Sequence, residues 1–197
     1  RGSFRNFPAN IKTINIRSYL KLFLFFLVLS VAMFFVDAVL IKFVQRLNHP
    51  FFVFFSRIGA ELGRGVYPWL FMIAWYFSGH LVRRNFWIST AFGTILSTAM
   101  SSAFCTVFKI SFLRARPNGN LGPFSFFNLD GLLKGDNLFQ SFPSGDVVVV
   151  AGIAYYLFLR TENKLLRIIL FILPLTTAFS RMDVNRHWPS DVFLSLG

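Results

Sequence analysis

The sequence predicts an all-α membrane protein, a polytopic bundle of six transmembrane helices with an interfacial helix between spans one and two. The first observation is composition: 55% of the residues are hydrophobic, 19% are aromatic and 28 are Phe. The second is that apolar residues come in runs of about twenty, the length that crosses a hydrocarbon core of roughly 30 Å. The third is length, since 197 residues suffice for one helical bundle without a second soluble domain.

The strong positive charge points to lipid rather than to nucleic acid. The net charge is +12, but no DNA-binding or RNA-binding motif accompanies it. Basic residues that flank apolar spans usually meet anionic lipid headgroups. We therefore predict the lipid bilayer as a partner and no nucleic acid. The single cysteine, Cys105, can form no internal disulfide and does not identify the compartment.

Residues 1–18 are predicted to precede the bundle. Arg1, Gly2 and Ser3 resemble the remnant of an expression tag. The residues that follow, up to 18, mix basic and apolar side chains, a pattern typical of an arm in the headgroup layer. Residues 19–197 are predicted to form a single transmembrane domain.

The first span is predicted at about 19–44. No cleavage signal of small residues accompanies it, so it is a retained helix rather than a signal peptide. Asp37 lies inside this span. An ionisable side chain at that depth is usually functional or paired, although a place near one end of the span would also let it reach water. On that ground we favour a structural role for Asp37.

The other apolar runs predict one interfacial helix and five further spans. Residues 49–65 are too short and too charged to cross a bilayer, so they are assigned to the interface. The further spans are predicted at about 66–81, 86–108, 144–159 and 165–179, with a sixth that begins near Pro189.

Two of these segments carry further expectations. The span at 86–108 is rich in Ser, Thr, Ala and Gly, which let helices approach closely, so we expect it at the centre of the bundle. The sixth run stops at Gly197, too short to cross, and we expect the natural chain to continue. A loop of about 25 residues after Pro117 has no periodicity, which is common in lids and binding loops.

Side chains suited to chemistry cluster at the ends of three apolar runs. The clusters are Lys109 with Arg116-Pro117, then Pro143-Ser144-Gly145-Asp146, then Ser180-Arg181 with His187 and Asp191. Since six spans place loops on alternating sides, all three clusters can converge at one membrane surface. Basic residues divide almost evenly between the two sides. A small excess on the N-terminal side, once site residues are set aside, favours a cytoplasmic N-terminus and an outward site.

The first two clusters are suited to an anion. An Arg such as Arg116 binds phosphate oxygens through two parallel hydrogen bonds, and Lys109 adds a point charge. Taken alone, both are equally consistent with cations that reach lipid headgroups. Ser144 can cap the fourth span, Gly145 allows a ligand to approach closely, and free N–H groups at the helix start favour an anion. Taken alone, this pattern is that of any helix start.

The third cluster predicts an oriented imidazole. Pro189 is well placed as the first residue of the sixth helix, which puts His187 just before it and Asp191 in its first turn. The carboxylate could then hold one imidazole nitrogen as N–H and leave the other free to attack. No second His, Cys or carboxylate stands at ligand spacing, so we predict no metal ion and no other cofactor.

Together the clusters read Lys-x6-Arg-Pro, Pro-Ser-Gly-x and Ser-Arg-x5-His-x3-Asp. This order resembles the signature of the type 2 phosphatidic acid phosphatase superfamily over about residues 105–195. The resemblance implies a metal-independent helical membrane enzyme that removes phosphate through a phosphohistidine intermediate. By matching positions it implies His187 as nucleophile and Asp191 as its orienting partner. It also implies a phosphate cradle formed by Lys109, Arg116, Ser144, Gly145 and Arg181.

One position departs from the family pattern. The family has His after Pro-Ser-Gly, where it protonates the leaving oxygen, and this chain has Asp146. An ordinary Asp, with a pKa of about 4, is ionised at neutral pH and cannot donate that proton. Either the substitution inactivates the protein, or Asp146 is a natural variant, protonated by burial or used only as base for the water step.

The resemblance favours a bacterial inner-membrane lipid phosphatase whose site faces the periplasm. The expected substrate is lipid A 1-phosphate or phosphatidylglycerophosphate. The alternatives are an undecaprenyl pyrophosphate phosphatase, a lipid-to-lipid phosphotransferase, and a non-catalytic phospholipid-binding membrane protein.

Overall fold

The computed structural model describes residues 16–127, 129, 133 and 137–196. Within them the regular secondary structure is entirely helical and no strand occurs, which confirms the predicted all-α class. The interfacial arm predicted before the first span lies almost wholly outside the described residues. The helices are α1 (Ile16–Met33), α2 (Asp37–Gln45), α3 (Pro50–Leu62), α4 (Val66–Leu81), α5 (Asn85–Phe112), α7 (Gly145–Arg160), α8 (Lys164–Asp183) and α9 (Pro189–Leu196), with short 3₁₀ turns at Pro117–Gly119 and Asn137–Phe139.

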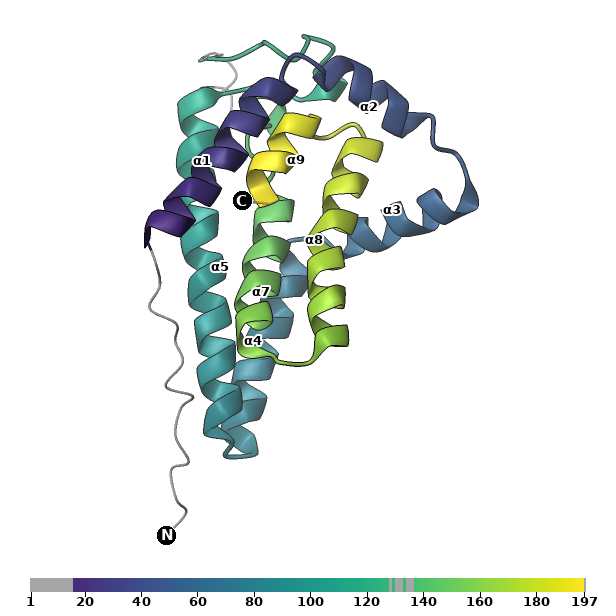
Figure 1. Cartoon of the computed structure of the whole chain (residues 1–197). Helices are drawn as coiled ribbons and strands as arrows, with labels where there is room; N and C mark the ends of the chain where they lie inside the picture. The colour runs from purple at the N-terminus through teal and green to yellow at the C-terminus, as the bar shows by residue number, and fades with distance from the viewer. Residues whose placement is uncertain (1–15, 128, 130–132, 134–136, 197) are drawn as a thin grey trace.

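The helices α4, α5, α7 and α8 form the body of the bundle (Figure 1). The helix α5 packs against both α4 and α7, α7 packs against α8, and α3 crosses α8. The short α9 lies near the start of α7, between α1 and α8, and contacts all three. The end of α5, the start of α7 and the end of α8 therefore meet around α9, which is where the three clusters lie.

The predicted first span at 19–44 is broken, contrary to the expectation of one helix. The helices α1 and α2 meet at an angle of 82°. At the break, the backbone N–H groups of Phe34, Phe35 and Val36 donate to carbonyls three residues earlier, at 3.3, 3.4 and 3.0 Å. Asp37 begins α2 with its side chain fully buried. Its hydrogen-bond partners lie on α9 and in the segment after α5, which explains why the helix turns here.

Length and composition alone give fewer complete spans than the six predicted. Among the described helices, α5 and α8 are long and apolar enough to cross a membrane, and the bent pair α1 and α2 would make a third. The helices α4 and α7 have 16 residues each, or about 24 Å. These helices and a wide belt of exposed Phe, Leu, Ile and Val side chains characterise a multi-pass membrane protein.

Small residues set the closest helix contacts. A Cβ at Gly59 of α3 would lie 2.1 Å from the backbone oxygen of Thr176 in α8. In α5, a Cβ at Gly93 would lie 2.0 Å from the hydroxyl of Tyr156 in α7. The small residues of α5 thus permit its close packing against α7.

We expect Gly59→Ala to destabilise the bundle, because the added methyl group meets a backbone oxygen that cannot move independently of α8. Overpacking of this kind typically costs about 1–3 kcal/mol. The measurement is the thermal unfolding midpoint in detergent. Gly65→Ala is the matched control, since a Cβ there has no atom within 4 Å. Equal midpoints for the two variants would contradict the tight crossing of α3 and α8.

Candidate active site

The structure brings residues of all three clusters together. The amine of Lys109 lies 3.2 Å from the position that a Cβ on Gly145 would take. Asp146 pairs with Arg181, with 3.2 Å between Oδ2 and Nη1. The charges of Lys109 and Arg116 both act on His187. A site with several cations around one imidazole therefore forms where α5, α7 and α8 meet.

The helix α5 ends before Arg116. The helix stops at Phe112, and Leu113 adopts the left-handed conformation with φ 43°. Arg116 lies beyond the helix, with φ −73° and ψ 155°, the extended conformation that a following proline favours. Its backbone N–H donates to the oxygen of Leu138 at 2.8 Å. Arg116 thus reaches the site from a fixed loop rather than from α5.

The start of α7 is held by its backbone rather than by the predicted serine cap. Ser144 occupies the N-cap position, but its side chain makes no capping hydrogen bond. Its backbone N–H instead donates to Oγ of Ser195 in α9 at 2.8 Å. The Oγ of Ser144 is buried and has no hydrogen-bond partner among the described residues.

Two guanidinium nitrogens share this property. Nε of Arg116 and Nε of Arg181 are buried and find no acceptor in the described part of the chain. Buried donors without partners are costly, so they usually mark a place where a ligand or water supplies the acceptor. Two cationic donors and the hydroxyl of Ser144 together suit an anion with several oxygens.

The imidazole of His187 is held in one tautomer. Its Nδ1 lies 2.7 Å from the carbonyl oxygen of Ser141. Because a carbonyl can only accept, Nδ1 carries the proton and Nε2 keeps its lone pair. Burial lowers the pKa of His187 below its usual value, the pairing with Asp191 opposes this, and the charges of Arg116 and Lys109 lower it further. At neutral pH the ring is therefore neutral.

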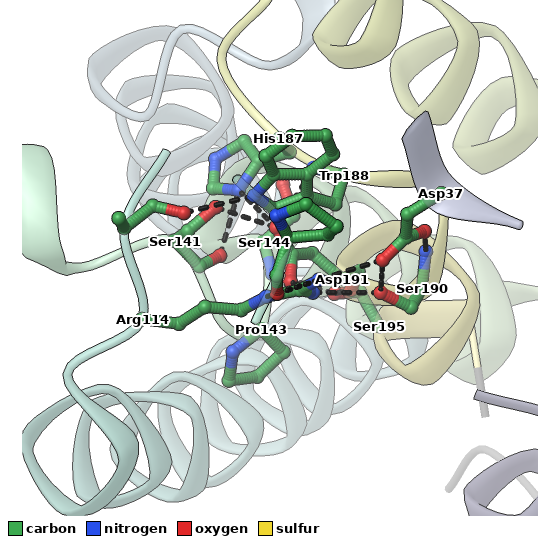
Figure 2. A network of polar contacts seen from close by, with 12 residues as sticks. Asp37, Arg114, Ser141, Pro143, Ser144, His187, Trp188, Ser190, Asp191 and Ser195 are labelled. Atoms are coloured by element: carbon green, nitrogen blue, oxygen red, sulfur yellow. Dashed lines mark hydrogen bonds and ion pairs between the residues drawn. The ribbon is translucent and has the colours of Figure 1, made fainter. Parts of the chain in front are cut away.

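Asp191 lies beside this ring but is bound mainly to other groups. Its Oδ2 is 3.8 Å from Nδ1 of His187, longer than a hydrogen bond. The carboxylate accepts from Oγ of Ser141 at 2.5 Å, from the backbone N–H of Trp188 at 2.8 Å and from Nη1 of Arg114 at 2.5 Å. Figure 2 shows these side chains as one connected network. The predicted direct hydrogen bond from imidazole to carboxylate is thus replaced by one to Ser141, which Asp191 in turn holds.

The sequence analysis missed several members of this network. Arg114 was not singled out, and its fully buried side chain joins Asp191 to Asp37. Asp37 was noted, but it does not reach water, since its exposure is 0%. A usable signal existed: an acidic residue inside an apolar span needs a cation, and Arg114 stands beside the Arg116 motif. Ser141 and Ser190 carried no signal in the sequence.

Asp146 occupies the first turn of α7 and faces the cationic side of the site. Its side chain is 35% exposed and its carboxylate is paired with Arg181. Asp146 is therefore less enclosed than Asp37 and Asp191, whose exposure is 0%. Arg181 is also held by α3, because its Nη2 donates to the backbone oxygen of Ala60 at 3.1 Å.

The fold and this arrangement define a helical membrane protein with several cations around a buried, neutral histidine. The sequence matches the model of the PAP2 superfamily over residues 90–197. The chain therefore belongs to the PAP2 superfamily. No curated protein sequence matches it significantly.

Two solved structures share the fold. Aquifex aeolicus LpxE is 23% identical, with a TM-score of 0.60, over 82% of this chain and 88% of that chain. A transmembrane PAP2-type phosphatidylglycerolphosphate phosphatase from Bacillus subtilis is also 23% identical, with a TM-score of 0.65, over 90% of this chain and 88% of that chain.

We expect His187 to titrate below its ordinary pKa of about 6.5. Its imidazole should remain neutral as the pH falls through 6.5 and gain its second proton only in more acidic solution. The measurement is an NMR titration of histidine-labelled protein, which has three His, with His187→Gln to assign the resonance. A midpoint at or above 6.5 would contradict the dominance of burial at this site.

Proposed function

We propose that the chain is built as a metal-independent phosphatase for a lipid phosphate monoester, acting through a phosphohistidine on His187. The observation that carries this proposal is that three of the buried donors without a partner among the described residues, Oγ of Ser144 and Nε of Arg116 and Arg181, belong to the three clusters around a neutral imidazole. Phosphate supplies several acceptor oxygens and the negative charge that these groups match. Family membership supports the same reading.

In the first step, Nε2 of His187 attacks phosphorus. An N–P bond forms, and the P–O bond to the lipid breaks, leaving the electron pair on the lipid oxygen. Lys109, Arg116 and Arg181 neutralise charge on the phosphoryl oxygens. The carbonyl of Ser141 accepts from Nδ1–H, and the nearby carboxylate of Asp191 stabilises the positive ring that forms.

In the second step, water attacks the phosphohistidine, an O–P bond forms and the N–P bond breaks. Inorganic phosphate leaves, and His187 regains its lone pair. The proton of the attacking water needs an acceptor, which the carboxylate of Asp146 can be. The same carboxylate cannot protonate the leaving oxygen in the first step, and the loss of a general acid typically costs about 10²- to 10⁴-fold in rate.

The proposed setting is the bacterial inner membrane, with the site at the periplasmic face. The site lies where loops join the helices rather than within their apolar middle, as a headgroup phosphate requires. Lipid A 1-phosphate or phosphatidylglycerophosphate is the proposed substrate. An undecaprenyl pyrophosphate phosphatase and a lipid-to-lipid phosphotransferase would use the same groups.

A non-catalytic phospholipid-binding protein is the second candidate, because Asp146 pairs with Arg181 at 3.2 Å and thereby weakens both acid catalysis and the anion site. Binding of lipid phosphate that survives His187→Ala, with no activity gained by Asp146→His, would favour it.

Asp146→His is the deciding variant. We expect it to raise the rate of phosphate release by about 10²- to 10⁴-fold, because it restores a general acid and removes a negative charge from the site. Release is measured as inorganic phosphate from each lipid monophosphate in mixed micelles, and labelled phosphate found on lipid would instead indicate transfer. Asp146→Asn is the matched control, since it removes the charge without supplying the acid. If Asp146→His releases no phosphate from any of these lipids, the enzymatic proposal fails.

A further inference from the structure

Arg114 is the most completely bound charged group among the described residues of the site. Its Nη2 donates to Oδ2 of Asp37 at 2.6 Å, and its Nη1 donates to Oδ1 of Asp191 at 2.5 Å and to Oγ of Ser190 at 2.6 Å. Nε and Nη2 also donate to the backbone oxygen of Pro123, at 2.9 and 2.8 Å. The guanidinium therefore has a fixed position and a fixed orientation.

Aromatic rings enclose this guanidinium. The centroids of Phe34, Phe126 and Trp188 lie 4.6, 5.2 and 5.6 Å from its central carbon. The exposure of Arg114 is 0%. In such surroundings water screens its charge little, so both carboxylates feel it strongly.

Asp37 is bound on both of its oxygens. Oδ1 accepts from the backbone N–H of Ser190 at 2.8 Å, and Oδ2 accepts from Oγ of Ser190 at 2.5 Å as well as from Arg114. The start of α2 is thereby tied to the first turn of α9, the turn that carries Asp191. Figure 2 shows Asp37 and Ser190 at one end of the network and His187 at the other.

One guanidinium serves two carboxyl groups. Arg114 binds Asp37 through Nη2 and Asp191 through Nη1, so the same group holds both side chains in place. The charged groups that act on the imidazole of His187 are Asp191 from α9, Lys109 from α5 and Arg116 from the loop after α5. Without Asp37, Nη2 of Arg114 would keep only the backbone oxygen of Pro123 as an acceptor among the described residues.

A gain in the stability of the fold does not explain why these charged side chains are buried together. Burying three charges costs desolvation energy, and apolar side chains of similar volume often stabilise a protein as well or better. The network is better explained by what it does at His187.

We propose that Asp37, acting through Arg114, is a positioning residue that fixes the carboxylate of Asp191 and thereby holds His187 as the Nδ1–H tautomer with Nε2 free. This role rests on the proposed phosphohistidine chemistry, but its structural consequence can be measured without turnover. It also explains the 82° break between α1 and α2, because the break brings Asp37 to α9.

The test is the tautomeric state of His187 in Asp37→Asn, measured from ¹⁵N shifts of histidine-labelled protein. The native chain is expected to show Nδ1–H alone. In Asp37→Asn we expect the ratio of Nδ1–H to Nε2–H to fall at least about tenfold. In the Asp146→His background, phosphate release should fall about 10- to 100-fold, the size of effect known for groups that orient the histidine ligands of metal sites.

Asp183→Asn is the matched control. Asp183 also accepts a hydrogen bond from a buried serine, with 2.5 Å between Oγ of Ser56 and its Oδ2. Among the described residues, the side chain of Asp183 makes no hydrogen bond to the Arg114 network. It should leave the tautomer of His187 unchanged. If Asp37→Asn does not fold, Ser190→Ala removes one bond from Asp37 and one from Arg114 and is expected to shift the tautomer in the same direction.

A single unchanged Nδ1–H tautomer in Asp37→Asn, or in Ser190→Ala where it replaces that variant, overturns the proposal whatever the activity. A shifted tautomer supports the positioning role even if no lipid phosphate is hydrolysed, and in that case the phosphatase proposal alone fails.

Discussion

The buried ion pairs of Arg114 are the interaction on which the site depends. They join three parts of the chain that are distant in sequence: the start of α2, the segment after α5 and the first turn of α9. Removing one member of a buried charge group leaves another charge without compensation, which typically costs about 3–5 kcal/mol. The same atoms that close the fold at this end therefore determine where Asp191 lies and, through Ser141, which nitrogen of His187 carries the proton.

The other helices place the remaining site residues around the Arg114 network. Two long apolar helices and their shorter neighbours provide a rigid body, and small residues such as Gly59 and Gly93 bring them close enough to exclude lipid from between them. The candidate site residues stand on helix ends and in loops, where backbone bonds such as that from Ser144 to Ser195 set their positions. Rigid helices with functional ends suit a site that must meet both lipid and water.

Much of this could be predicted from the sequence, because apolar run length and local turn chemistry are local properties. The helix Val66–Leu81 falls at the predicted residues, and motif residues on three segments converge. The features that could not be predicted depend on contacts between residues far apart in the sequence. The break before Asp37 depends on Arg114, 77 positions away, and no pattern near either residue reveals the pair. Likewise, Ser144 occupies the N-cap position of α7, but its hydroxyl makes no capping hydrogen bond. Its backbone N–H instead donates to Ser195 in α9.

The pair between Asp146 and Arg181 bears on the ionic form of a bound ligand. A phosphate monoester carries close to two negative charges above its second pKa of about 6 and one charge below it. The carboxylate beside Arg181 repels the doubly charged form about twice as strongly as the singly charged form. The carboxylate therefore offsets part of the attraction that the cations of the site exert on a phosphate, and it offsets more for the doubly charged form than for the singly charged form.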